Sequence, residues 1–267
     1  MKRLKRTLGL VALLCLAMTG TALANWTPPQ HLTWYWQLQG TPKIEPVMAT
    51  DIDGFDNSAA EVATLHAAGQ HVICYIDVGT AENWRSDYGS FPAGVQGNTN
   101  GWPGEKWLDV RQLSVLEPIM AARFQMCQQK GFDAVEPDNT DGFENGTGFP
   151  ISAAQQATFN EWVANKVHSL GMAVLQKNDP DQASLLQPYF DGVVDEQCNQ
   201  YSECDSFSSY LAAGKPVLNA EYQSSPDPNF PRRCAAGYGP RPLSTAVRES
   251  GRAARRTARR SAGPYGA

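Results

Sequence analysis

Short apolar stretches alternate with longer amphipathic ones along most of this 267-residue chain. The short stretches are rich in β-branched and aromatic residues, which favours strands, whereas the longer ones repeat apolar residues at helical spacing. Seven strands are predicted, at 32–38, 47–53, 71–78, within 131–142, and at 172–177, 192–196 and 216–221. Helices are predicted between most of them, at 58–68, 115–130, 152–170, 181–189 and 206–213.

Local signals support these helix boundaries. Ser58 is a plausible N-cap, and Glu61 follows three residues later, as in a capping box. Glycines stand where the helices are expected to end, at Gly69, Gly131 and Gly171.

A polar or acidic group follows nearly every predicted strand. Clearest is the sequence GFDAVEPDNTDG at 131–142, where a short apolar stretch leads into Glu136, Asp138, Asn139 and Asp141. A doubly wound sheet would place its site at one switch point, whereas a barrel gathers all its strand ends at one face. The pattern therefore predicts an α/β fold, a (β/α)8 TIM barrel with its site at the carboxyl ends of the strands.

The end of the chain departs from this pattern, because only seven strands are found before residue 222. From about residue 224 the sequence becomes rich in Arg, Ala, Pro and Gly, with RAARRTARR at 252–260. The segment 224–267 is interpreted as an atypical tail, in which the eighth strand and helix are missing or altered. It is either a disordered basic tail or the product of a shifted reading frame, and the abrupt change in composition favours the second.

The first 24 residues have the features of a secretory signal peptide. A basic start is followed by an apolar run from Leu8 to Met18 and by Ala22-Leu23-Ala24, a small-x-small cleavage site. The apolar run is too short to span a membrane. We expect a secreted or periplasmic protein in which residues 25–223 form the barrel domain.

The net charge of −5 conceals a strongly acidic body. Residues 25–231 hold 9 basic and 26 acidic residues, a formal charge of −17. Such a field repels nucleic acid and attracts cations, so it favours a cationic substrate over a nucleic-acid partner. We expect a monomer.

Six cysteines are present, and five remain once Cys15 leaves with the signal peptide. Export makes disulfides plausible. Cys198 and Cys204 are close enough to close a small loop, and Cys74 and Cys127 are candidates for a bridge between elements. The sequence shows no pattern typical of a zinc site.

Paired carboxylates are the chemistry that the sequence offers, since it has no G-x-S-x-G motif, no phosphate loop and no H-E-x-x-H motif. In glycoside hydrolysis one carboxyl protonates the leaving oxygen while another attacks the anomeric carbon or activates water. The segment 80–107 is predicted to be a long loop rich in Gly, Asn, Trp and Pro, and its length suggests part of a binding wall. Aromatic residues such as Trp36, Tyr75 and Trp102 could stack on sugar rings or simply pack in the core.

Six motifs in chain order resemble glycoside hydrolase family 114, the endo-α-1,4-polygalactosaminidases. They are WYWQLQ at 34–39, ICYIDVG at 73–79, WPGEKWLD at 102–109, GFDAVEPDN at 131–139, DEQC at 195–198 and AEY at 220–222. The resemblance implies a (β/α)8 barrel without a cofactor or metal that cleaves α-1,4-linked galactosamine polymers. Some members are hydrolase domains of biofilm-exopolysaccharide proteins.

The resemblance also implies which residues act. The catalytic pair falls on Asp138, expected to be the nucleophile of a retaining mechanism, and on Glu196, the expected general acid/base. The expected substrate-binding residues are Trp36, Asp53, Tyr75, Asp77, Glu136, Asn139, Lys177, Asp195, Glu221 and Tyr222. Carboxylates among them would pair with the ammonium groups of the polymer, and Lys177 would contact sugar hydroxyls or neutralise the acids.

Three alternatives remain open at this point. The barrel could hydrolyse a neutral or N-acetylated glycan, or it could bind a glycan without cleaving it. A calcium site in the loop 138–145 is a third hypothesis, although Thr140 stands where an EF-hand needs Asp or Asn.

Overall fold

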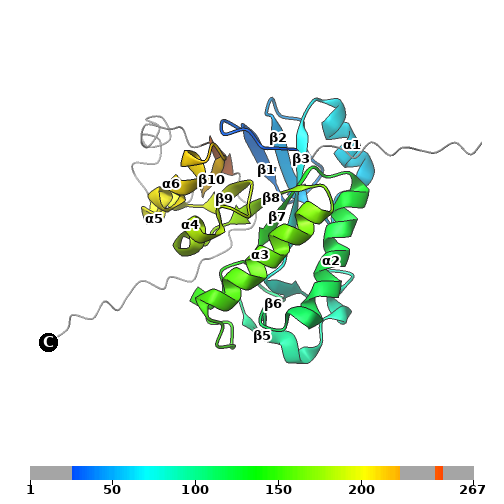
Figure 1. The fold of residues 1–267 in the computed structure, drawn as a ribbon. Coiled ribbons are helices and arrows are strands. Elements are labelled where there is room, and N and C mark those ends of the chain that lie inside the picture. The colour runs from blue at the N-terminus through cyan, green and yellow to red at the C-terminus, as the bar shows by residue number, and fades with distance from the viewer. Residues whose placement is uncertain (1–25, 223–243, 249–267) are drawn as a thin grey trace, which may run out of the picture.

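The computed structural model describes residues 26–222 and 244–248, and they form a parallel sheet surrounded by helices (Figure 1). The strands of the sheet are β1 (Trp34–Gln37), β2 (Ala49–Asp53), β3 (His71–Asp77), β7 (Ala134–Asp138), β8 (Ala173–Lys177), β9 (Gly192–Glu196), β10 (Val217–Tyr222) and β11 (Ser244–Arg248). They lie in this order, and each pairs in parallel with the next. β11 also lies beside β1, so the sheet curls into a nearly closed barrel.

The predicted fold class is confirmed, and each of the seven predicted strands is present. The eighth strand, β11, lies within the segment 224–267 that the sequence pattern suggests is an atypical tail. The rest of that segment, Cys234 and the predicted signal peptide lie outside the described residues, so those interpretations remain predictions. No helix in the described ranges combines the length and apolar character that a membrane crossing requires.

Helices connect most of the strands, and their boundaries follow local sequence signals. They are α1 (Ala59–Ala67), α2 (Leu113–Lys130), α3 (Ala153–Ser169), α4 (Ala183–Leu186), α5 (Cys198–Tyr201) and α6 (Ser208–Ala212). The predicted capping box is present, because Ser58 accepts from the backbone of Glu61 and the Glu61 side chain accepts from the backbone of Ser58. α2 ends at Gly131, whose φ of 89° is the left-handed conformation that glycine adopts without strain.

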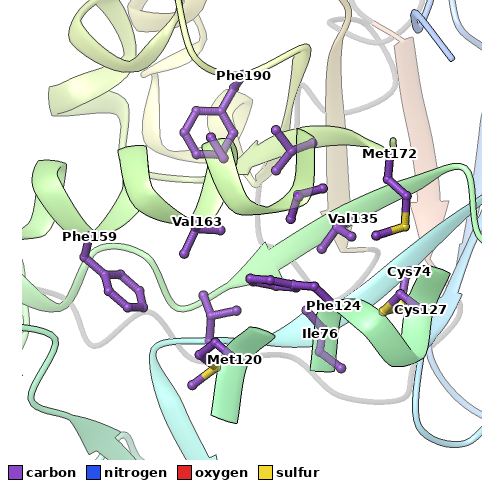
Figure 2. Close-up of a cluster of buried hydrophobic side chains, with 14 of the residues drawn as sticks. Cys74, Ile76, Met120, Phe124, Cys127, Val135, Phe159, Val163, Met172 and Phe190 are labelled. Atoms are coloured by element: carbon purple, nitrogen blue, oxygen red, sulfur yellow. A yellow bond between two sulfur atoms is a disulfide. The ribbon is translucent and has the colours of Figure 1, made fainter. Parts of the chain in front are cut away.

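Two apolar layers stabilise the barrel, one on each face of the sheet. The outer layer lies between the strands and the helices, and Figure 2 shows Phe124 of α2 and Val163 of α3 meeting Ile76 and Val135. The inner layer lies inside the barrel and contains Trp34, Trp36, Ala49, Ile73, Tyr75, Ala134, Ala173, Leu175, Val194, Leu218 and Ala220. Because side chains alternate along a strand, this division fixes which residues face the barrel interior.

The predicted long loop at 80–107 is wrong in part, because a small antiparallel sheet lies within it. β4 (Thr80–Glu82), β6 (Glu105–Leu108) and β5 (Gln96–Thr99) pair in that order. The sequences TAE, QGNT and EKWL carry little apolar alternation, so strand periodicity does not reveal them.

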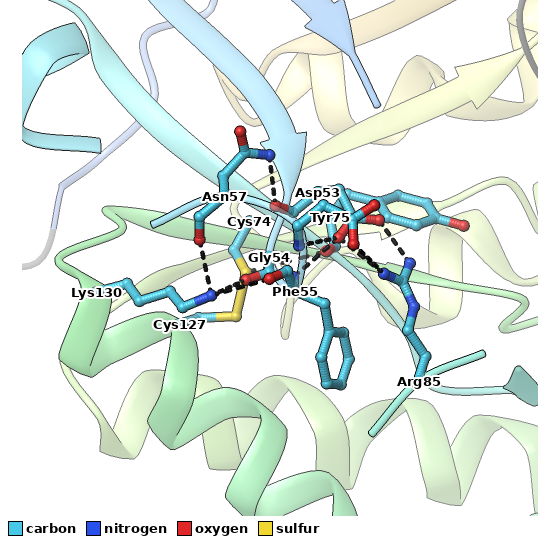
Figure 3. The surroundings of a disulfide bond; sticks show 10 residues. Asp53, Gly54, Phe55, Asn57, Cys74, Tyr75, Arg85, Cys127 and Lys130 are labelled. Carbon is cyan, nitrogen blue, oxygen red and sulfur yellow. Dashed lines mark hydrogen bonds and ion pairs between the residues drawn. A yellow bond between two sulfur atoms is a disulfide. The ribbon is translucent and has the colours of Figure 1, made fainter. Parts of the chain in front are cut away.

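Both disulfides anticipated from the sequence are formed. Cys74 of β3 is bonded to Cys127 of α2, and Cys198 is bonded to Cys204. Figure 3 shows the first bridge beside Lys130, whose ammonium group donates to the carbonyls of Gly54 and Asn57 at 2.6 and 2.7 Å. The turn after β2 is thus fixed to the end of α2.

Candidate active site

Four charged side chains meet inside the barrel at the carboxyl ends of three neighbouring strands. Glu136 and Asp138 come from β7, Lys177 from β8 and Glu196 from β9. Glu196 shares the interior face of β9 with Val194, a member of the inner apolar layer. The structure therefore brings the predicted catalytic pair together with two of the predicted binding residues.

Lys177 is at the centre of this group. Its Nζ atom lies 2.6 Å from Oε1 of Glu136, 3.3 Å from Oδ1 of Asp138 and 3.6 Å from Oε2 of Glu196. The ammonium group also lies 4.7 Å from the centre of the Trp36 ring and 5.7 Å from that of Tyr75. One cation thus connects both proposed catalytic carboxylates to a third one.

The charge of this lysine is maintained by its partners. Burial alone opposes the charged form, but the negative charges of Asp138, Glu136 and Glu196 outweigh it and raise the pKa of Lys177 well above its usual range. Lys177 therefore stays charged and holds the three carboxyl groups around it through ion pairs.

Asp138 is held by three donors. Its Oδ2 accepts from the hydroxyl of Tyr75 at 2.6 Å, and its Oδ1 accepts from the backbone N–H of Asn139 at 2.8 Å and faces Lys177. Burial, followed by the charge of Asp138, raises the pKa of Tyr75 well above its usual range, so Tyr75 stays a hydrogen-bond donor. These contacts fix the orientation of the carboxyl group.

The turns that follow β7 and β9 help to hold the site. Asn139 adopts a φ of 61°, and its side chain donates to Oδ2 of Asp77 at 2.6 Å. The backbone N–H of Glu196 donates to Oδ1 of Asn178 at 2.9 Å, and Gln197 follows with a φ of 69°. Left-handed backbone at non-glycine residues is uncommon, and it is concentrated here at the strand ends.

Two further predicted residues lie near the rim of the barrel and are already engaged. Asp53 forms an ion pair with Arg85 at 2.5 Å, visible in Figure 3, and accepts from two backbone N–H groups of the following turn. Asp77 accepts from the backbone and hydroxyl of Thr80 and from Asn139. Burial, together with Glu105 and Glu82, raises the pKa of Asp77 well above its usual range.

Asp195 and Glu221 lie on the opposite face of the sheet from Glu196. Asp195 alternates with Val194 and Glu196, and Glu221 alternates with Ala220, so both point toward the layer beneath the helices. Glu221 there accepts from the N–H of Asn199 at 2.9 Å. Tyr222 is the last residue of β10, and its side chain lies outside the described part of the structure.

One interior acid was not among the predicted site residues. Asp51 of β2 faces the barrel interior, is fully buried, and interacts with the carboxyl group of Glu136 near the predicted catalytic pair. The available signal was its spacing, since Asp51 and Asp53 are two residues apart and therefore face the same side of β2.

Within the described residues, one group of three acidic side chains has oxygens close enough to share a metal ion. They are Asp77, Glu82 and Glu105, with ligand atoms within 4.8 Å of one another. Asp77 already accepts from Thr80 and Asn139, and Glu82 pairs with Arg85 at 2.8 Å. The loop 138–145, considered above for calcium, contributes none of these three residues.

Comparison with known proteins agrees with glycosidase chemistry at this site. A family model described as glycoside-hydrolase family GH114 matches residues 16–260. The crystal structure of Aspergillus fumigatus Ega3 in complex with galactosamine is similar, with 32% sequence identity and a TM-score of 0.78, covering 84% of this chain and 94% of that one.

Two more distant relatives extend the comparison. The glycoside hydrolase domain of PelA from Pseudomonas aeruginosa has a TM-score of 0.55 at 13% identity, covering 78% of this chain and 89% of that one, which is a likeness of fold alone. An uncharacterized protein of Deinococcus radiodurans is 25% identical, over 73% of this chain and 72% of its own length.

Proposed function

Because this chain belongs to glycoside hydrolase family GH114, we propose that it cleaves a galactosamine-containing polysaccharide with Asp138 and Glu196 as its catalytic pair. The observation that carries the proposal is the contact of both carboxylates with one buried ammonium group, that of Lys177. Such an arrangement supplies the two carboxyl groups that glycoside hydrolysis requires, at the end of the barrel where barrel enzymes act.

The two carboxyl groups are assigned different roles. Asp138 is the nucleophile, because Tyr75, Asn139 and Lys177 hold its carboxyl group in one orientation. Glu196 is the general acid that protonates the leaving oxygen and then the base that activates water. Tyr75 and Asn139 orient Asp138, and Lys177 contacts both carboxyl groups and fixes their relative position.

A retaining mechanism is proposed, and the distances to the shared ammonium group are compatible with it, as they are with the closest inverting pairs. Oδ1 of Asp138 and Oε2 of Glu196 lie 3.3 and 3.6 Å from the same Nζ atom of Lys177. The distance between these two oxygens therefore cannot exceed the sum of the two contacts. Retaining pairs are separated by roughly 5–5.5 Å and inverting pairs by roughly 6.5–9.5 Å. Identifying the first-formed anomer by NMR tests this assignment, and a β-anomer as first product would exclude it.

A cationic polymer is the proposed substrate. Galactosamine is the ligand named for the similar Ega3 structure, and the −17 charge of residues 25–231 attracts a polymer of ammonium groups. The acids expected to pair with those groups, Asp53, Asp77, Glu136 and Glu221, are each bonded to groups of the protein itself. Their support for a cationic substrate is therefore through long-range charge.

The test is release of reducing ends from an α-1,4-linked galactosamine polymer. We expect Asp138→Asn and Glu196→Gln each to lower kcat by at least about 10³-fold. The exposed residues Asp181 and Glu117 provide matched controls, Asp181→Asn and Glu117→Gln, expected to retain wild-type rates. Full activity in either catalytic variant would rule out the pair.

Two outcomes would favour the alternative functions. A rate that is equal before and after chemical N-acetylation of the polymer would point to a hydrolase of neutral glycans. Binding of the polymer without release of any product would instead identify a glycan-binding barrel.

Secretion is proposed from residues 1–24 and from the two disulfides, which form in oxidising compartments.

A further inference from the structure

Asp51 is an acid whose surroundings lack an obvious donor. It lies in the middle of β2, between Trp36 of β1 and Ile73 of β3 in the strand register, and is fully buried. Neither of its carboxyl oxygens receives a hydrogen bond from any N–H, hydroxyl or ammonium donor, and the same is true of Oε2 of Glu136. Buried polar atoms in folded proteins are nearly always paired.

The oxygens without a donor belong to two acids that interact with each other. The Asp51 and Glu136 carboxyl groups are within hydrogen-bond contact, and ionised carboxylates are acceptors only. One proton between them resolves the conflict, because it turns two repelling acceptors into a donor and an acceptor. Burial, followed by the charge of Glu136, raises the pKa of Asp51 well above its usual range.

The geometry indicates which acid carries the proton. Burial raises the pKa of Glu136, but its Oε1 lies 2.6 Å from the ammonium group of Lys177, a contact that acts in the opposite direction. Asp51 has no cation at such a distance among the described residues. The proton therefore belongs to Asp51, which then donates to Oε2 of Glu136.

We propose that Asp51 is a protonated positioning residue, which holds Glu136 through a hydrogen bond and through it keeps Lys177 between Asp138 and Glu196. This role rests on the proposed function, in which Asp138 and Glu196 are the catalytic carboxyl groups. A neutral Asp51 leaves a single negative charge below the lysine. A second charge there would draw the ammonium group away from Asp138 and Glu196 and would repel both of them.

The proton itself can be detected without any substrate. An infrared difference spectrum at neutral pH between wild type and Asp51→Asn is expected to contain the carbonyl stretch of a carboxylic acid from the wild type. Protonated groups elsewhere in the protein cancel in this difference. A carboxylate band in its place would overturn the proposal, whatever the enzyme hydrolyses.

The positioning role is tested by two variants that differ in one property. Asparagine keeps the shape and donates an N–H to Glu136, so Asp51→Asn is expected to keep kcat within about threefold of wild type. Leucine donates nothing, and Asp51→Leu is expected to lower kcat on the order of 10²-fold with an unchanged KM. If Asp51 instead acted through a negative charge, asparagine could not replace it, and Asp51→Asn would be impaired.

Each remaining outcome has a defined meaning. An Asp51→Asn variant that folds but is as impaired as Asp51→Leu would overturn the proposal, as would wild-type kinetics in both. If Asp51→Leu does not fold, the infrared band and the kinetics of Asp51→Asn still decide. If the wild type does not cleave the galactosamine polymer, the proposed function fails while the infrared result stands on its own.

Discussion

The Nζ atom of Lys177 lies 2.6 Å from Oε1 of Glu136, and both side chains are essentially closed to solvent. The two residues come from the adjacent strands β8 and β7, so the sheet itself sets their contact. Desolvating an ion pair is costly, and this pair is compensated by further carboxylates and by two aromatic rings. Removing either partner should therefore have a large effect.

We expect Lys177→Met to lower the free energy of unfolding by about 3–5 kcal/mol, because it leaves buried carboxylates without their cation. Urea denaturation followed by fluorescence measures this loss. The double variant Lys177→Met/Glu136→Gln should lose less than the sum of the two single variants, by at least about 1 kcal/mol. Additive losses would mean that the two residues are not energetically coupled.

Tyr75 donates to Asp138 at 2.6 Å, and Tyr75→Phe removes only this hydroxyl. A hydrogen bond to a charged group contributes roughly 1.5–3 kcal/mol, so kcat on the galactosamine polymer should fall by about 10–10²-fold with little change in KM. Tyr189 packs against the outer core cluster, away from the site, and Tyr189→Phe is the matched control. An equal loss in both variants would indicate a general effect of removing a tyrosine hydroxyl.

Much of the fold is predictable because its signals are local. The Ser58–Glu61 capping box, the glycine that ends α2 and the acids at the strand ends each lie within a few residues of the feature that they indicate. The predicted catalytic pair, Asp138 and Glu196, also lies in short motifs, and it is implied by the resemblance of those motifs to the family. β11 is the exception, since five residues in a segment of unusual composition carry a weak strand signal.

The parts of the site that were not predictable depend on contacts between distant strands. β9 is buried on both faces, and Val193 and Val194 are equally apolar. The alternation of apolar and polar residues along the strand therefore does not reveal whether Asp195 or Glu196 faces the barrel interior. Asp195 was predicted to be a substrate-binding residue, and the structure places it on the outer face of β9. Asp51 was overlooked for a related reason, because its partner Glu136 lies two strands away in the sheet.

Gly79 lies so close to the backbone of Asn139 that no side chain fits between them. A Cβ atom at position 79 would collide with the carbonyl oxygen of Asn139, and the N–H of Gly79 donates to the carbonyl of Asp138 at 3.2 Å. We expect Gly79→Ala to displace the turn that carries Asp138, lowering stability by about 1–3 kcal/mol and lowering kcat as well. Thermal unfolding and polymer hydrolysis measure the two effects.

Gly89 provides the control for this substitution. A Cβ atom there would meet nothing within 4 Å, so Gly89→Ala should change stability by no more than about 0.5 kcal/mol and leave kcat unchanged. Wild-type stability and activity in Gly79→Ala would contradict the close approach described for Asn139.

Burial, followed by the charges of Asp141 and Glu144, raises the pKa of Asp179 to about 8. An unfolded aspartate titrates near 3.9, so between about pH 4 and pH 8 the folded state holds a proton that the unfolded state has lost. Stability from this group therefore falls as pH rises through that window, by about 1.4 kcal/mol for each pH unit. We expect Asp179→Asn to flatten this slope and to be more stable than wild type above about pH 8.

Denaturation curves across this pH range test the expectation for Asp179. Asparagine tolerates the left-handed φ of 56° at this position, so the backbone should not be strained by the change. The exposed Asp205 gives the control Asp205→Asn, which should keep the wild-type slope because Asp205 is not among the charges that act on Asp179. Identical slopes in wild type and Asp179→Asn would mean that Asp179 does not hold its proton in the folded state.

The two disulfides close loops of very different length, which separates their effects on stability. Cys74 and Cys127 are 53 residues apart, and Cys198 and Cys204 are 6 apart. In the chain-entropy account, the longer loop contributes about 4 kcal/mol and the shorter one about 2 kcal/mol. We therefore expect Cys74→Ala/Cys127→Ala to lower the free energy of unfolding roughly twice as much as Cys198→Ala/Cys204→Ala, measured by guanidinium denaturation under oxidising conditions. A larger loss in the second variant would show that local packing, and not loop closure, determines what each bridge contributes.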